Sequence, residues 1–418
     1  MHFLKVGLTF ATSTLSKLLA GLVIIKILSV YLGAEGLGQL GQFMSFMAII
    51  TIMAGGGIAT GLVKYVSQFR DQAAQLGNYI SAAAGITLAA SALLGMALFG
   101  GAPWLSAWLM GTPDYASVIR VLALVQFAIG SSNFFTGLVS GHQRVSAFAI
   151  VTSASAALGA ALVAFLCIRH GMGGAMIGLV LFPALPLVFL LGWYRFGLRM
   201  RWQALLPRWR PLETGKLLQY SMMLLTSALT MQLSQILIRK LIVGESSWVD
   251  VGYWQAVSKV SDAYLQFITV VLANYYLPRL AALATPKQIG AEVRLACKIV
   301  IPLLLLVCSA IYVLRDLVIV LLFSRQFLPM REFFTWQLAG DCFKIFAYIG
   351  AYVTVAGGNT RLYIAAELIQ VTLVLGFSYV LVGRYGAIGA TYAHCATYVC
   401  YAALVYAVLT RFIVTSRP

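Results

Sequence analysis

Charged residues are scarce in this chain. Only 10% of its 418 residues are Asp, Glu, Lys or Arg, whereas 61% are hydrophobic. A soluble domain carries roughly 25% charged residues, which solvate its surface. A large soluble protein is therefore excluded. The alternating segments of about 10 residues that are typical of a membrane β-barrel are also missing. These absences leave one class, an all-α protein with many membrane-spanning helices.

Acidic residues are fewer still. The chain holds 12 Asp and Glu against 29 Lys and Arg, which gives a net charge of +17. In a soluble protein this excess would suggest a nucleic-acid partner. In a membrane protein the gathering of Lys and Arg in cytoplasmic loops explains it first. We therefore expect the bilayer, and no nucleic acid, as the surroundings of this chain.

Metal-binding and cofactor motifs are also missing. The six cysteines form no CxxC pair and the four histidines are scattered, so we interpret the cysteines as packing residues. We expect no metal and no cofactor. The first apolar stretch is not followed by a small-residue cleavage site, which indicates a retained helix and not a signal peptide.

Twelve apolar runs are long enough to span a bilayer, which takes about 20 residues. They cover 6–32, 40–66, 77–99, 117–140, 146–168, 172–194, 215–243, 251–276, 296–322, 333–356, 361–382 and 386–412. The basic segment 195–214 separates six runs from six. We expect an N-terminal six-helix bundle (1–194), a basic cytoplasmic linker (195–214) and a C-terminal six-helix bundle (215–418). Most loop Lys and Arg residues then lie on the side of both termini, which indicates cytoplasmic termini.

The two halves share a pattern that indicates an internal duplication. Residues of the same type recur at equivalent helix ends with nearly constant spacing. The matching pairs are Lys26 with Lys240, Gly38 with Gly252, Gly171 with Gly383 and Gly174 with Gly386. Two six-helix repeats have the same orientation, so their axis would lie along the membrane normal, and a substrate path is expected between them.

Ionisable side chains inside the spans are the most informative residues. One charge at the centre of a spanning helix costs about 2.5–3.5 kcal/mol, so such residues are expected to face a water-filled cavity or each other. Three polar stripes follow helical spacing in the second half. They comprise Gln232, Gln235 and Arg239, then Gln255, Lys259, Asp262 and Gln266, then Gln337, Asp341, Lys344 and Tyr348.

The first half contributes fewer polar residues. Lys17 and Lys64 lie inside spans, and Asn133 belongs to a stripe of small and polar residues that close helix packing explains equally well. The expected cavity residues are Lys17, Lys64, Asn133, Gln232, Gln235, Arg239, Gln255, Lys259, Gln266, Gln337 and Lys344.

Several of these residues have a second interpretation. Lys26 and Lys240 lie near the outer ends of their spans, where a lysine can extend to the headgroups, so we set them apart from the cavity. Lys259 with Asp262, and Asp341 with Lys344, can pair within their own helices.

The sign of the in-span charges predicts the cargo. Bases outnumber acids there, so a cavity lined by them is positive and favours an anion. Lysine and arginine suit phosphate, and neighbouring amides and hydroxyls suit sugar hydroxyls. A lipid diphosphate that carries sugars fits both. Asp262, Asp341 and Glu367 could titrate and couple transport to a proton gradient.

Five stretches then indicate a family. They are KYVSQF (64–69), RVLALVQF (120–127), GYWQAVSKVSDAYLQFIT (252–269), LPRLAAL (277–283) and REFFTWQLAGDCFKIFAYIGAY (331–352). Together they resemble the Wzx-type lipid-linked oligosaccharide flippases, the polysaccharide branch of the multidrug/oligosaccharidyl-lipid/polysaccharide (MOP) exporter superfamily, and most closely the members that serve enterobacterial common antigen. The resemblance spans essentially the whole chain.

This resemblance implies a fold, a cargo and a place in the cell. The fold would be two six-helix bundles in a V around a central cavity, related by pseudo-two-fold symmetry. The cargo would be an undecaprenyl-diphosphate-linked oligosaccharide, either lipid III or an O-antigen unit, moved by alternating access from the cytoplasmic to the periplasmic leaflet of a bacterial inner membrane. A polysaccharide polymerase and a chain-length regulator would be partners.

Two other classes stay open. A multidrug or solute antiporter of the same superfamily is expected to favour acids over bases in its cavity, and a lipid II flippase resembles a fourteen-helix plan for which 418 residues leave no room. A membrane polymerase or ligase would place its chemistry on a large external loop, and none of the expected external loops gathers an acid–base group. We therefore expect a transporter and not an enzyme.

Overall fold

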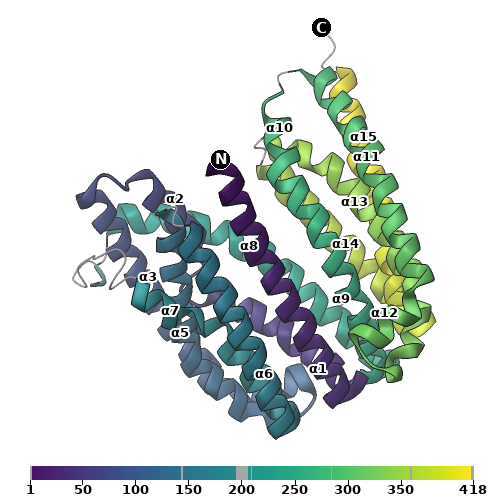
Figure 1. Cartoon of the computed structure of the whole chain (residues 1–418), viewed down its shortest axis with the longest axis horizontal. Helices are drawn as coiled ribbons and strands as arrows, with labels where there is room; N and C mark the ends of the chain where they lie inside the picture. Colours follow the sequence, from purple (N-terminus) through teal and green to yellow (C-terminus); the bar gives the residue numbers. More distant parts are fainter. Residues whose placement is uncertain are drawn as a thin grey trace. The chain divides into compact units, whose positions relative to one another are not determined.

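A computed structural model describes residues 2–142, 145–193, 206–208, 210–283, 285–357 and 360–415 of the chain. The described part is almost entirely helical and holds no β-strand (Figure 1). Each of the twelve expected ranges falls mainly on helix where it is described, although residues 54–58 interrupt the range 40–66. The prediction of an all-α architecture is thus confirmed.

Two compact units make up the chain. Unit 1 comprises Met1–Leu32 and Gln42–Gln232, and unit 2 comprises Gly33–Gly41 and Leu233–Pro418. Residues 33–41 therefore belong with the C-terminal part of the chain. Most of the expected linker 195–214 lies outside the described residues, and the division placed there stays a prediction.

The described residues of the first part of the chain form seven α-helices. They are α1 (His2–Met53), α2 (Ala59–Gln68), α3 (Ala73–Gly100), α4 (Ala102–Met110), α5 (Ala116–Gly141), α6 (Val145–Leu181) and α7 (Pro186–Trp193), with short 3-10 turns at Pro113–Tyr115 and Phe182–Ala184. The short helix α4 lies where the sequence indicated only a loop. Pro103 stands in its first turn and Gly111 ends it in the left-handed conformation, so both ends carry ordinary helix-boundary residues.

The second part forms eight more. They are α8 (Pro211–Glu245), α9 (Trp248–Val271), α10 (Leu277–Ala281), α11 (Pro286–Val313), α12 (Arg315–Leu322), α13 (Phe334–Ala356), α14 (Thr360–Tyr385) and α15 (Gly389–Thr415), with a π-turn at Leu272–Tyr276 and 3-10 segments at Arg325–Phe333 and Gly386–Ile388. Ser247 caps α9 by accepting from the Asp250 amide, and Thr285 with Gln288 forms a capping box on α11.

Among the described residues, eight helical stretches are long and apolar enough to cross a membrane. Three of them, Leu15–Met53, Phe148–Gly192 and Leu362–Thr410, have 39, 45 and 49 residues, about twice the length of one span. Each is divided by a glycine with positive φ: Gly33 (66°), Gly171 (58°) and Gly386 (61°). Because a residue with a Cβ is strained in that conformation, glycine lets the chain end one span and begin the next without a loop.

The glycine breaks correct the register of the duplication. Gly171 corresponds to Gly386, and not to Gly383, since both break a helix with positive φ. Three residues further on, a Cβ added to Gly174 or to Gly389 would meet a carbonyl oxygen of the preceding helix, that of Leu166 or of Leu381. The sequence match was shifted because Gly383 and Gly386 repeat the spacing of Gly171 and Gly174.

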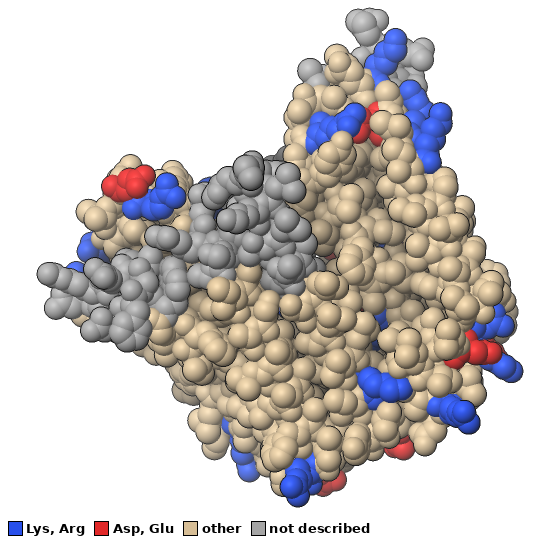
Figure 2. Space-filling view, viewed as in Figure 1, with Lys and Arg blue, Asp and Glu red and all other residues tan. Residues whose placement is uncertain are grey.

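Unit 1 has an apolar core where α2, α3 and α5 meet. Its largest buried members include Leu62, Ile80 and Phe134, and the rings of Tyr65 and Tyr79 stack at 4.3 Å. In unit 2, α13 packs against α9, α11 and α15, and α14 lies along α15 (Figure 1). On the face shown in Figure 2, most of the charged side chains of unit 2 lie toward its ends, and a broad uncharged zone lies between them.

Candidate functional site

A buried carboxylate is the centre of the polar residues in unit 2. Asp341 on α13 has no exposed surface. Its Oδ1 lies 3.0 Å from His394 Nε2 on α15 and accepts from Gln337 Nε2 at 3.5 Å. Its Oδ2 accepts a hydrogen bond from the Tyr264 hydroxyl on α9. Both carboxylate oxygens are therefore bound by side chains of the protein itself, and three helices meet at this residue.

Glycine makes this approach of two helices possible. Gly340 lies where the His394 ring passes α13, and a Cβ at Gly340 would collide with that ring and with the backbone of Cys395. The sequence before Asp341 thus allows α15 to approach closely enough for a histidine to reach the carboxylate. Small residues at such crossings are the usual means of close helix packing in membranes.

Three thiols surround the same site. Cys308 Sγ on α11 lies 3.8 Å from the Tyr264 hydroxyl and 3.8 Å from Cys342 Sγ, and Cys395 follows His394. All are free cysteines. They fill the space around the polar pair, which agrees with the interpretation of the cysteines as packing residues. Among the residues described, no three His, Cys, Asp or Glu side chains gather as ligands of a metal ion would.

Lys344 lies one turn beyond Asp341 but is held by aromatic rings. Its Nζ lies 5.4 Å from the Tyr398 ring and 6.0 Å from the Tyr348 ring, within the range of cation–π attraction. The Tyr398 hydroxyl accepts from Gln370 Nε2 at 3.1 Å, and the Tyr398 ring meets the His394 ring edge-on at 4.9 Å. Instead of the Asp341–Lys344 pair considered from the sequence, Asp341 has a direct contact with His394 on α15.

A second buried cation lies on α8. Arg239 is 3% exposed. Its Nε and Nη2 both donate to Gln255 Oε1, at 3.1 and 2.6 Å, and its guanidinium lies 5.5 Å from the Trp254 ring. Gln255 in turn packs against Gly41, where a Cβ would meet the glutamine side chain. The sequence placed Arg239 and Gln255 on separate stripes, and the fold brings these stripes together.

The stripe on α9 passes from buried to exposed. Gln255 is buried, Lys259 is half-buried, and Asp262 and Gln266 are exposed. Lys259 Nζ lies 3.1 Å from Asp262 Oδ2, and their side chains are 32% and 60% exposed. The pairing within one helix that the spacing allowed is therefore present. The charged side chains of this stripe therefore lie toward the exposed end of α9.

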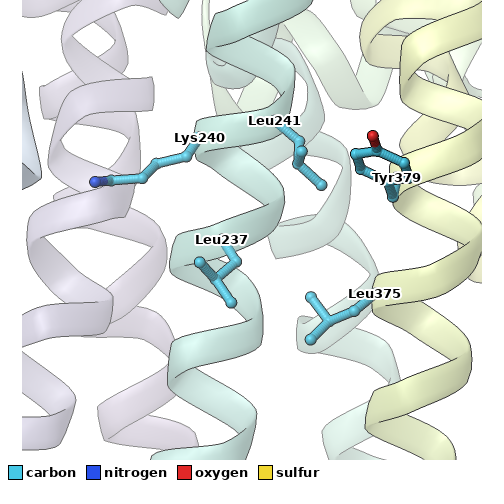
Figure 3. Close-up of a pocket in the computed structure, with 5 residues that line it drawn as sticks. All are labelled: Leu237, Lys240, Leu241, Leu375 and Tyr379. Carbon is cyan, nitrogen blue, oxygen red and sulfur yellow. The ribbon is translucent and has the colours of Figure 1, made fainter.

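The remaining predicted residues of unit 2 lie apart from Asp341. Glu367 accepts from the Tyr363 hydroxyl on its own helix at 3.0 Å. Gln235 and Lys240 on α8 are half-buried. Lys240 lines a pocket of about 370 Å³ with Leu237, Leu241, Leu375 and Tyr379. Figure 3 shows Leu241 and Tyr379 directed toward one another while Lys240 extends away from them. This apolar pocket does not have the lining that a sugar would need.

In unit 1 the predicted residues have local partners. Lys17 Nζ lies 5.6 Å from the Phe148 ring, and Lys64 Nζ lies 5.3 Å from the ring of its neighbour Tyr65. Both lysines are exposed, whereas Lys26 and Gln232 are half-buried.

Asn133 has a clear structural use. Its Nδ2 donates to the carbonyl oxygens of Thr51 at 2.7 Å and Ala54 at 3.3 Å. These carbonyls end α1 just before three glycines of positive φ, residues 55–57. The Asn133 amide thus fixes the C-terminal end of α1. This role favours close helix packing as the explanation of the small and polar stripe that contains Asn133.

The sequence reasoning missed His394, Tyr264 and Tyr398. His394 could have been found, because a histidine inside an apolar run is an intramembrane ionisable residue like the lysines and acids that were examined. Tyr264 and Tyr398 carried no such signal. Tyrosine is common in this chain, with 20 copies, and only the packing of α9 and α15 on α13 distinguishes these two.

Comparison with known proteins agrees with this architecture. Residues 3–284 match the model of the family described as "Polysaccharide biosynthesis protein". The lipid III flippase of Escherichia coli (strain K12) is 36% identical over 408 residues, which cover 97% of this chain and 97% of that protein.

Solved structures share the fold at low identity. A multidrug resistance MATE family transporter of the MOP superfamily, in its inward-facing conformation, superposes with a TM-score of 0.76 at 16% identity, over 96% of this chain and 95% of the other. The lipid II flippase MurJ in an inward closed conformation superposes with a TM-score of 0.72 at 13% identity, over 99% of this chain and 88% of the other. The expected MOP-type polytopic helical fold is confirmed.

Proposed function

This chain belongs to the polysaccharide biosynthesis protein family, and from that premise we propose that it is a flippase which moves a lipid-linked oligosaccharide from one membrane leaflet to the other. The observation that carries the proposal is the 36% identity to a lipid III flippase over 97% of both chains. A match of 408 residues is long enough to extend over both units of the chain.

The charges of unit 2 support an anionic cargo. Arg239 and Lys344 are cations on long apolar helices, and each is held by neutral groups, Gln255 or tyrosine rings. These contacts orient the two cations, and acidic side chains also act on them electrostatically: Asp262 on Arg239, and Asp341 on Lys344. A phosphate or diphosphate is the group that such cations bind best. The sugars would meet amides and hydroxyls, of which Gln266 is an exposed example.

The direction of transport and the site in the cell follow from the same proposal. Cargo would be collected at the cytoplasmic leaflet of a bacterial inner membrane and released at the periplasmic leaflet, with both termini in the cytoplasm. The concentration of Lys and Arg in the loops on the same side as both termini supports this orientation. Asp262, Asp341 and Glu367 are the candidates for coupling to protons. A polymerase and a chain-length regulator would act on the released cargo.

Complementation tests the proposed function. An Escherichia coli strain without its lipid III flippase is expected to regain surface polysaccharide when this chain is produced, and a strain without an O-antigen flippase serves as the comparison that identifies the oligosaccharide. Failure to restore either strain, with the protein present in the membrane, would contradict the proposal. Lys344→Gln is expected to abolish rescue, whereas Lys344→Arg, which keeps the charge, is expected to retain part of it.

Two results would favour the competing classes. Rescue of drug resistance without rescue of polysaccharide would indicate an antiporter. Extension or transfer of an oligosaccharide by the purified protein would indicate a polymerase or ligase. The matched control for both assays is Lys298→Gln, which replaces an exposed lysine near the middle of α11.

A further inference from the structure

His394 on α15 and Asp341 on α13 form a hydrogen-bonded pair of titratable side chains that joins two helices. Asp341 is 0% exposed, and the His394 side chain is 18% exposed. The histidine is therefore the member of the pair that a proton can reach. A carboxylate so far from water exchanges protons only through a neighbour.

We propose that His394 is the residue through which protons reach Asp341, and that the Asp341–His394 pair ties the protonation state to the position of α9. This inference rests on the proposed flippase activity and identifies the group that would couple that activity to a proton gradient. Proton coupling was expected at three acids, and the geometry distinguishes Asp341 from the other two. Asp262 is exposed and Glu367 is bound only by a tyrosine of its own helix.

The two ring nitrogens of His394 have different tasks. Nε2 lies 3.0 Å from Asp341 Oδ1, so it donates its hydrogen to the carboxylate and Nδ1 is then the acceptor of the neutral ring. An incoming proton binds Nδ1, and the Nε2 hydrogen passes to Oδ1. The pair has taken up one proton, the ring is neutral again as the other tautomer, and the carboxylate has become an acid. Release follows the reverse order.

Loss of the carboxylate charge changes the contact with α9. Tyr264 donates to Asp341 Oδ2, and a hydrogen bond to a charged acceptor is about twice as strong as one between neutral groups. Protonation at Oδ1 therefore weakens the link between α9 and α13. Since α9 also carries Lys259, Asp262 and Gln266, the weakened link frees the helix whose exposed end would contact cargo.

Other titratable groups surround the pair and define its environment. They are Tyr264 from α9, Cys308 from α11, Cys342 and Lys344 from α13, and Cys395 and Tyr398 from α15. Glu367 on α14 lies apart from the pair and is bound by Tyr363. Lys344 is the cation nearest in sequence to the pair. A neutral histidine beside an ionised Asp341 leaves that lysine as the balancing charge.

The test uses the full-length protein in proteoliposomes with a lipid-linked oligosaccharide in one leaflet and an imposed pH gradient. One pH unit provides at most about a tenfold bias for each proton coupled. The wild type is expected to flip cargo faster with the gradient than without it. His394→Gln keeps an N–H donor for Asp341 but cannot carry a proton. This variant is therefore expected to flip cargo equally fast with and without the gradient, so that the ratio of the two rates is near one.

Two further variants keep the test decisive. His170→Gln replaces an exposed histidine of unit 1 and is the matched control, expected to retain the full response. Tyr264→Phe removes the donor to Oδ2 and keeps the ring, and it is expected to reduce the ratio with Asp341 and His394 intact. Rates are taken per folded monomer, so a loss of yield does not enter the ratio.

The outcomes separate this inference from the proposed function. A His394→Gln protein that responds to the gradient as the wild type does would overturn the inference and leave the flippase activity intact. A wild type that flips cargo with no response to the gradient would also overturn it. A wild type that flips no cargo would instead contradict the proposed function.

Discussion

Gly38 and Gly252 lie against each other and make reciprocal contacts. A Cβ on Gly38 would reach the carbonyl oxygen of Trp248, four residues before Gly252, and a Cβ on Gly252 would reach the carbonyl oxygen of Ala34, four residues before Gly38. Each helix therefore offers the same surface to the other, as in a two-fold contact between identical subunits. This local symmetry is what the duplication in the sequence predicts.

The glycine crossing gives the first prediction. Gly252→Ala should destabilise unit 2 by about 1–3 kcal/mol, because the added methyl meets a backbone carbonyl that has no side-chain freedom. The thermal melting temperature of the detergent-solubilised protein measures this. Gly376→Ala on α14 is the control, since nothing lies within 4 Å of its added Cβ. Equal melting temperatures for the two variants would show that the helices are not in close contact at Gly38 and Gly252.

The second prediction concerns Asn133. Asn133→Ala should lower stability by about 1–3 kcal/mol, because the carbonyls of Thr51 and Ala54 lose their donor. Asn274→Ala is matched to it, since that exposed amide bonds only to Val270 on its own helix and its loss should change melting little. If Asn133→Ala melts like the wild type but transports poorly, the residue belongs to a cargo path and the packing interpretation is wrong.

Arg239 gives the third prediction. Arg239→Lys should cost about 1.5–3 kcal/mol, since one ammonium cannot reproduce the two donors that converge on Gln255 Oε1. Complementation and melting temperature together check this. Arg279→Lys, at a site with a half-exposed side chain paired to Glu292 at 2.8 Å, should leave both nearly unchanged. Full activity and stability of Arg239→Lys would indicate that charge alone matters at this position.

The Lys259–Asp262 pair gives the fourth prediction, with the opposite pattern. An exposed pair contributes only about 0.2–1 kcal/mol, so Lys259→Gln with Asp262→Asn should melt close to the wild type. The same double variant should nevertheless lose transport, because both charges lie on the exposed end of α9. The melting temperature and complementation of the two single variants, Lys259→Gln and Asp262→Asn, complete the double-mutant cycle. A large fall in melting temperature would identify the pair as structural.

Contacts within one helix could be predicted from the sequence, and contacts between helices could not. Lys259 and Asp262 pair because residues three apart share a face. Asp341 instead finds its partner on α15, 53 residues later along the chain, because Gly340 lets that helix approach. Helical spacing determines which residues share a face, but it does not determine which face of another helix lies opposite.

The positions of the spans were also predictable, since apolar length alone determines them. The connections between spans were harder to predict from the sequence, because Gly33, Gly171 and Gly386 connect successive spans without a polar loop. The stripe with Asn133 shows the same limit. A small-and-polar pattern is compatible with a cavity wall or with close packing, and only its bonds to Thr51 and Ala54 favour the second.

The composition of unit 2 has a consequence for synthesis of the chain. Residues 33–41 belong to this unit although they leave the ribosome long before the rest of it. At 5–20 residues per second, the roughly 200 residues between Gly41 and Gln255 take about 10–40 s to appear. During that interval Gly38 and Gly41 have no partner helix. Residues 33–41 therefore remain in the membrane without their partner helix during this interval. A chaperone or insertase that shields the growing chain would act on this segment.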